Sequence, residues 1–137
     1  MDSRRELILA ALATALNAVR SPYALEYSAS RVVSVTDDEE VITSDFDNDL
    51  HSMAVTLAAV DVFDEATLER GKATNALLAW LQQGAVADRT LGGLCEDIRL
   101  TRSYPVYSDS PSHFIAAIVE ATITYRTALD NPFAAAP

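Results

Sequence analysis

Two stretches of the chain place apolar residues three and four positions apart, which is the spacing of a helix with one buried face. The first covers residues 3–20 and opens with Ser3-x-x-Glu6, a capping box in which each side chain binds the other residue's backbone N–H. The second covers residues 65–83, and Asp64 is a suitable N-cap for it. The pattern therefore predicts two amphipathic helices.

Period-two alternation of β-branched and apolar residues, typical of strands, occurs at residues 31–36, 50–63, 94–107 and 113–127. Residues 23–30 are irregular and fit either a short edge strand or an extended arm. The resulting order, α-β-β-α-β-β, predicts an α+β fold in which a single sheet of mainly antiparallel strands carries both helices. We expect one domain over residues 1–137, with residues 128–137 as a flexible C-terminal tail.

Residues 88–102 join the second helix to the last two strands. The helical spacing stops at Asp88, and alternation begins after Gly92 and Gly93. Because adjacent glycines allow backbone angles that other residues resist, we expect a tight turn between a packed helix and a central hairpin.

The predicted strands are long for a domain of this size. A strand of about 14 residues spans about 46 Å, whereas a compact domain of this length has a diameter of about 37 Å. The hairpin should therefore bend or protrude, and a protruding apolar hairpin commonly contacts another chain. Residues 50–63 are apolar on both faces, which indicates a central strand or one that a partner covers.

The composition is that of a folded protein, with 137 residues of which 50% are hydrophobic. Its net charge of −10 disfavours tight binding to nucleic acid, because such binding needs clustered Lys and Arg. We expect a soluble protein without a signal peptide or membrane span, and the single cysteine fits a reducing compartment. Seven of the twenty acids fall close together, in what we expect to be one long loop: Asp37, Asp38, Glu39, Glu40, Asp45, Asp47 and Asp49.

Candidate catalytic groups are few. The chain has no Gly-x-Ser-x-Gly motif, and His51 and His113 lie in predicted strands, where a structural role is the more frequent one. Cys95 neighbours Glu96 and Asp97, which would raise its thiol pKa and make it a packed small residue. We therefore expect a protein that is not an enzyme.

The acidic segment also contains the start of a calcium-loop pattern, Asp45-x-Asp47-x-Asp49. Leu50 stands where that loop needs its turn glycine, and Thr56 stands where it needs a bidentate glutamate. We therefore expect a solvated loop and no cofactor. A weak divalent-ion contact between subunits is the alternative, since a cation would relieve the repulsion among crowded acids.

Three short segments carry a family resemblance: Arg4-Arg5-Glu6-Leu7-Ile8 at the start, Asp88-Arg89-Thr90-Leu91-Gly92-Gly93-Leu94 after the second helix, and Ile123-Thr124-Tyr125-Arg126-Thr127 before Asn131-Pro132. With these segments, the size, element order and acidity, the chain resembles the tail terminator, or tail completion, proteins of long-tailed bacteriophages over nearly its full length. It departs from them in the acidic segment after Thr36 and in residues 23–30.

The resemblance implies a structural virion protein that acts by binding. Such a protein forms a homo-oligomeric ring, usually of six copies, which caps the tail tube and ends its polymerisation. The implied partners are the major tail tube protein and the head completion or connector protein, with DNA passing through the lumen without specific binding and no membrane contact. The implied location is the tail–head junction of the virion, assembled in the cytoplasm of the host bacterium.

Ring contacts join two different surfaces of each copy. The candidates for these subunit or tube contacts are the strand residues Met53, Val55, Leu57 and Phe63 and the hairpin residues Tyr104, Tyr107 and Phe114. The seven clustered acids are candidates for a lumen lining, because negative charge there would let DNA slide without sticking. The alternative for these acids is a loop that faces solvent.

Two other functions remain open from the sequence. One is another neck component, such as a head completion or connector protein, which shares the size and acidity. The other is a small αβ ligand-binding or enzyme domain, which predicts a closed apolar pocket with a few convergent polar groups.

Overall fold

The computed structural model describes residues 2–18, 32–62, 70–106 and 114–136. Its elements are α1 (Arg4–Ala18), β1 (Val32–Ser44), β2 (Asn48–Val62), α2 (Arg70–Val86), β3 (Asp97–Val106), β4 (Phe114–Ala128) and β5 (Asn131–Ala135).

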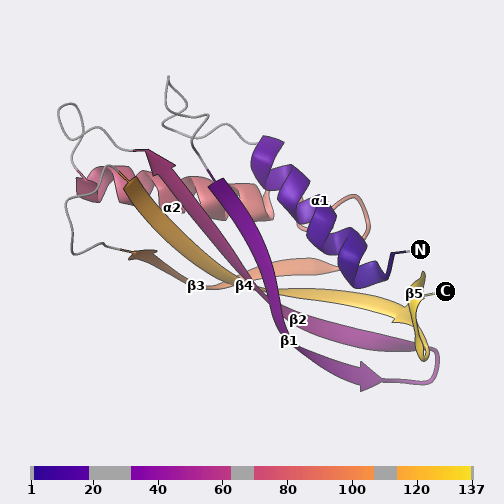
Figure 1. The fold of residues 1–137 in the computed structure, drawn as a ribbon. Coiled ribbons are helices and arrows are strands. Elements are labelled where there is room, and N and C mark those ends of the chain that lie inside the picture. The colour runs from indigo at the N-terminus through magenta and orange to yellow at the C-terminus, as the bar shows by residue number, and fades with distance from the viewer. Residues whose placement is uncertain (1, 19–31, 63–69, 107–113, 137) are drawn as a thin grey trace.

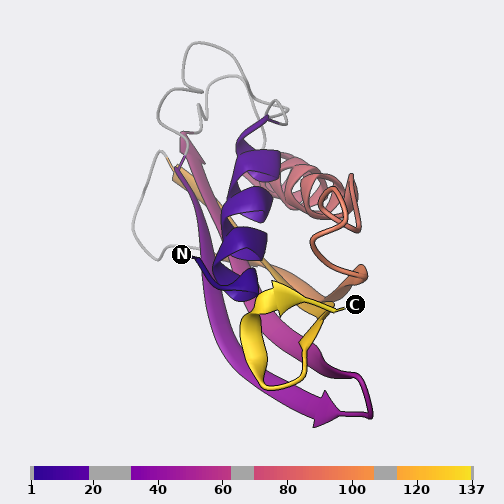
Figure 2. The same ribbon diagram turned by 90° about the vertical axis from the view of Figure 1, so that its right-hand side faces the viewer.

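All the described strands belong to one antiparallel sheet. Its order is β1-β2-β4-β3, and β5 turns back to pair with the end of β4. The two helices lie on the same face of this sheet, as two views a quarter-turn apart show (Figures 1 and 2). The opposite face carries no described helix, so the described part of the molecule has two layers with one bare side.

The core forms where the helices cover the sheet. On β2 and β4, alternate residues are buried under the helices, and the residues between them point to the bare face and are half-buried. The helices contribute stripes at helical spacing, as predicted. The largest fully buried side chains come from both layers: Ile8, Leu12, Leu16, Met53, Val55, Leu57, Leu77, Leu81, Ile98, Val119 and Ile123.

The predicted fold is wrong in its strand order. The structure has α-β-β-α-β-β-β, because residues 128–137, expected to be a flexible tail, contain the fifth strand, β5. The chain reverses at Asp130, whose φ of 56° is left-handed. The Asp130 N–H donates to the carboxylate of Asp49 over 2.9 Å, and this bond fixes the reversal that β5 needs.

The predicted acidic loop is also wrong. Most of the segment belongs to β1, which runs on to Ser44, and only residues 45–47 form the turn into β2. A bulge between Asp37 and Glu40 interrupts the pairing with β2. Asp38 and Glu39 lie in this bulge and have no paired residue on β2. The acids are therefore held in a hairpin with defined register.

We predict that Leu57→Ala lowers the free energy of unfolding by about 2–5 kcal/mol, because it leaves a cavity in the core. Leu57 is fully buried at the centre of β2. Val41→Ala is the matched control on the same hairpin, where the side chain is 59% exposed, and it should cost about 1 kcal/mol at most. Equal losses for the two variants in urea unfolding would contradict the assigned burial.

Candidate functional site

The sheet extends past the helices at the end formed by the β1–β2 turn and the β4–β5 turn, at the lower right of Figure 1. Large apolar side chains are exposed there: Phe46 is 100% exposed, Val41 59% and Ile42 54%. Leu129 and Phe133, at 44% and 51%, add to them from the β4–β5 side. We call these five residues the distal end. Val41 pairs with Ser52 and Ile42 with His51, so these neighbours lie on opposite faces of the sheet, and the exposed apolar side chains occur on both faces of this end. Exposed apolar surface of this kind is a candidate for contact with a partner.

Local hydrogen bonds hold the distal end in shape. The Asp45 carboxylate accepts the backbone N–H groups of Asp47 and Asn48, each over 3.0 Å, and these bonds lower its pKa. Asp49 accepts the hydroxyl of Ser44 over 2.6 Å and the N–H of Asp130 over 2.9 Å, and these bonds lower its pKa too. Both turns are thereby fixed to one another, so the exposed residues belong to a preorganised surface.

A buried polar network lies between the distal end and the core. The rings of His51 and Tyr125 stack with centroids 4.4 Å apart. His51 Nε2 lies 2.8 Å from the hydroxyl of Thr127, and Nδ1 lies 3.3 Å from the Glu40 carboxylate without the alignment of a hydrogen bond. The Tyr125 hydroxyl donates to Glu40 over 2.5 Å. The network therefore joins β1, β2 and β4 through side chains.

Arg5 extends this network to α1. Its guanidinium contacts Asp37 at 2.6 Å and Glu40 at 3.4 Å, and it donates to the backbone oxygen of Asp38 over 2.9 Å. Burial and the hydrogen bond to Glu40 raise the pKa of the Tyr125 phenol, so the hydroxyl stays protonated and donates at neutral pH. The arrangement has the character of a structural clamp, because His51 and Tyr125 are 4% and 2% exposed and have little access to solvent.

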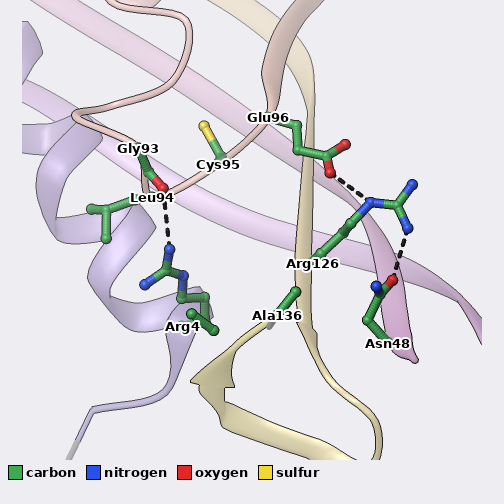
Figure 3. Close-up of a pocket in the computed structure, with 9 residues that line it drawn as sticks. Arg4, Asn48, Gly93, Leu94, Cys95, Glu96, Arg126 and Ala136 are labelled. Carbon is green, nitrogen blue, oxygen red and sulfur yellow. Dashed lines mark hydrogen bonds and ion pairs between the residues drawn. The ribbon is translucent and has the colours of Figure 1, made fainter.

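A pocket of about 310 Å³ lies between the start of α1, the 88–95 turn and β5 (Figure 3). Arg4 enters it and donates to the backbone oxygen of Gly93 over 3.1 Å. Arg126, on the other side, binds Glu96 over 2.6 Å and the Asn48 side chain over 2.7 Å. Charged groups and backbone dominate the lining, which is unlike the apolar lining of most small-molecule sites.

The predicted turn at Gly92 and Gly93 is present, and both glycines have positive φ, 69° and 91°. Leu91 shares this geometry at 49°. Asp88 holds the turn: its carboxylate accepts the N–H of Gly92 over 2.9 Å and the N–H and hydroxyl of Thr90, and these bonds lower its pKa. The turn thus positions α2 against the start of β3.

Cys95 ends this turn as a buried, unreactive thiol. Burial, followed by the negative charges of Asp88 and Asp97, raises its pKa to about 11. The thiol is therefore protonated at neutral pH and donates to the backbone oxygen of Arg89 over 3.3 Å.

The structure separates the predicted contact residues. Met53, Val55 and Leu57 are at most 1% exposed and are enclosed by this chain's own helices, so another chain has no access to them. Tyr104 is half-buried on the bare face, where Arg102 lies 4.6 Å over its ring. Phe114 begins β4, and Phe63, Tyr107 and His113 lie outside the described residues.

The seven acids have different surroundings. Asp37 and Glu40 pair with Arg5, while Asp45 and Asp49 bind the turns. Three carboxylates are exposed and have no partner among the residues that the structure describes: Asp38, Glu39 and Asp47. Within the same residues, no group of three or more His, Cys, Asp and Glu side chains is arranged to hold a metal ion.

Sequence reasoning missed the distal end and the network. Val41 and Ile42 are adjacent β-branched residues in an acidic segment, and this was the available signal for a strand there. The contact of Glu40 with Tyr125 joins residues 85 positions apart, and no local pattern indicates it.

No known protein-family model matches the chain, and a comparison with curated proteins found no match. Among the described helices, none has the length and apolar character needed to cross a membrane.

We predict that Tyr125→Phe destabilises the protein by about 1–2 kcal/mol, because Glu40 loses a hydrogen-bond donor inside the network. Tyr104→Phe is the matched control on the bare face and should change the unfolding free energy by less than about 0.5 kcal/mol. Thermal and urea unfolding would measure both; equal effects would contradict the clamp.

We predict that Asp88→Asn makes stability less sensitive to acid. The folded-state pKa of Asp88 is lowered, so its contribution is present above its ordinary pKa near 3.8 and is lost as the pH falls through the folded value. Unfolding free energies measured from about pH 5 to pH 2 should fall more steeply for the wild type than for the variant. Parallel curves would show that Asp88 does not bind the turn.

Proposed function

We propose that this chain is a structural virion protein that caps a bacteriophage tail tube. In this proposal several copies form a ring, end the polymerisation of the major tail tube protein, and present a surface to the head completion or connector protein. The protein acts by binding, at the tail–head junction, and DNA passes through the ring. The sequence resemblance to tail terminator proteins suggests this role.

The observation that carries the proposal is the distal end. A monomeric enzyme gains nothing from a fully exposed Phe46 beside exposed Val41 and Ile42, whereas a protein that docks onto a tube needs such a surface. The hydrogen bonds of Asp45 and Asp49 fix its shape before binding, which lowers the entropy cost of association.

The bare face of the sheet is the second support. Most of its central residues on β2 and β4 are small or polar, among them Ala54, Thr56, Ala58 and Thr122, with Ile118 as a larger apolar one, and this face carries no described helix. A sheet whose second face is only half-buried can lie against another layer or line a passage. Another neck component would use the same features, and binding partners distinguish the two.

The other class, a small ligand-binding domain, requires a pocket, and the one beside Arg4 is the candidate. Its volume is at the lower limit for such sites, and Arg126 is already held by Glu96 and Asn48. These features favour a packing gap between α1 and β5 over a ligand-binding site.

We predict that tails assembled without this chain contain tubes of uncontrolled length, and that adding it back restores a defined length. Phe46→Asp should fold normally, because the side chain is fully exposed, and should fail to limit the tubes. Leu7→Gln changes an exposed apolar residue on α1, outside the distal end, and is the matched control.

Electron microscopy of tubes polymerised with each variant measures the result. Normal tube lengths in the absence of the chain would refute the capping role. Defined lengths with Phe46→Asp would show that the distal end is not the docking surface.

A further inference from the structure

The two outer strands of the sheet carry opposite charge. β1 holds four acidic residues and no basic one, whereas β3 holds two arginines and one aspartate. Both strands are edges of the β1-β2-β4-β3 sheet, and no described strand pairs with their outer sides. Each edge therefore lacks a further strand partner among the described residues and carries one predominant charge.

The charges also lie at the same height on the sheet. The bulge lies between Asp37 and Glu40 of β1. Through the pairings of β2 and β4, Asp37 is level with Leu100 of β3, and Glu40 is level with Ile98. The bulge residues, Asp38 and Glu39, are therefore level with Arg99. A copy displaced sideways, without a shift along the strands, would bring these groups together.

The side chains concerned are available. Asp38, Glu39 and Arg99 are exposed, and none of the three side chains has a hydrogen-bond or ion-pair partner in the described part of the chain. The bulge itself is held in place, because Arg5 binds the carboxylate of Asp37 and the backbone oxygen of Asp38. The acidic edge is thus preorganised by α1.

The strand directions permit the same pairing. Because neighbouring strands alternate in direction across four strands, β1 and β3 run in opposite directions. A second copy in the same orientation therefore places its β3 antiparallel to β1 of the first, with the helices of both copies on the same side. Pro105 has no N–H to donate, so the pairing should run along the part of β3 around Arg99.

We infer that copies of this chain associate edge to edge, β1 of one copy with β3 of the next, with Asp38 and Glu39 of the first facing Arg99 of the second. This contact is heterologous, so it continues from copy to copy and closes into a ring when the curvature allows. The inference rests on the proposed ring and names the surfaces that form it.

Charged residues and bulges at sheet edges commonly prevent unwanted pairing, which is the competing explanation for the acids of β1. Pairing of β1 with another β1 would indeed place like charges together, and so would pairing of Arg99 with another Arg99. The charges thus oppose both symmetric pairings and favour only the heterologous one. The two explanations predict opposite effects of charge reversal.

A charge swap tests the inference on the full chain. Arg99→Glu and Glu39→Arg should each weaken self-association, roughly fivefold per contact, because each replaces the attraction between positions 39 and 99 by a repulsion. The double variant restores opposite charges between positions 39 and 99. It should recover part of the association lost in each single variant, because Asp38 still opposes a glutamate at position 99. Arg99→Lys keeps the charge, and Asp47→Lys reverses an exposed acid in the β1–β2 turn, outside both edge strands; both should associate like the wild type. Sedimentation velocity over a concentration series measures the assemblies, and circular dichroism confirms folding.

The outcomes separate this inference from the capping role. Single reversals that leave assembly unchanged would overturn edge pairing, and so would a wild-type chain that stays monomeric at its highest soluble concentration. Stronger association of Glu39→Arg would instead establish edge protection. If the swap restores assembly while tube lengths do not respond to the protein, edge pairing holds and the capping role fails.

Discussion

The pairing of β2 with β4 is the constraint on which the rest of the structure depends. The two strands are paired from Asn48 with Ala128 to Val62 with Phe114, without a bulge. This register decides that one set of alternate residues lies under the helices and the other set lies on the bare face. It also brings together His51 with Tyr125 and Asp49 with Thr127, so both the clamp and the fixed turns follow from it.

The buried face of these strands changes character along its length. From Met53 to Ala59 it is apolar, because the apolar stripes of α1 and α2 cover it. Toward the distal end, the cover is supplied by Arg5 and Glu40, and the buried residues become polar, as with His51 and Thr127. Hydrogen bonds and stacking replace apolar contact there, since buried polar groups need partners. The sheet can therefore extend past its helices without losing order.

Local patterns predicted much of this architecture but missed what depends on distant contacts. The capping box at Ser3 and Glu6 and the turn at Gly92 and Gly93 have strong local signals, and both are present. The acidic half of β1 was missed because Asp and Glu are unfavourable in strands, and here Arg5 and Tyr125 compensate. Strand β2 is apolar on both faces, so alternation could not tell which face the helices cover. The C-terminal segment forms β5 because the Asp130 N–H binds Asp49. These residues are 81 positions apart, so no local pattern indicates the contact.

The central position of β4 has a consequence for synthesis and folding. The β1–β2 hairpin and α2 precede β4 in the chain, yet β4 must lie between β2 and β3 before the sheet exists. Contacts between segments so distant in sequence form late, because closing a long loop costs entropy first. Until then β2 has an unpaired side of its own, and β3 lacks its neighbour. A nascent chain is thus unable to offer the finished pair of edges, so the proposed association between copies requires molecules that have completed folding.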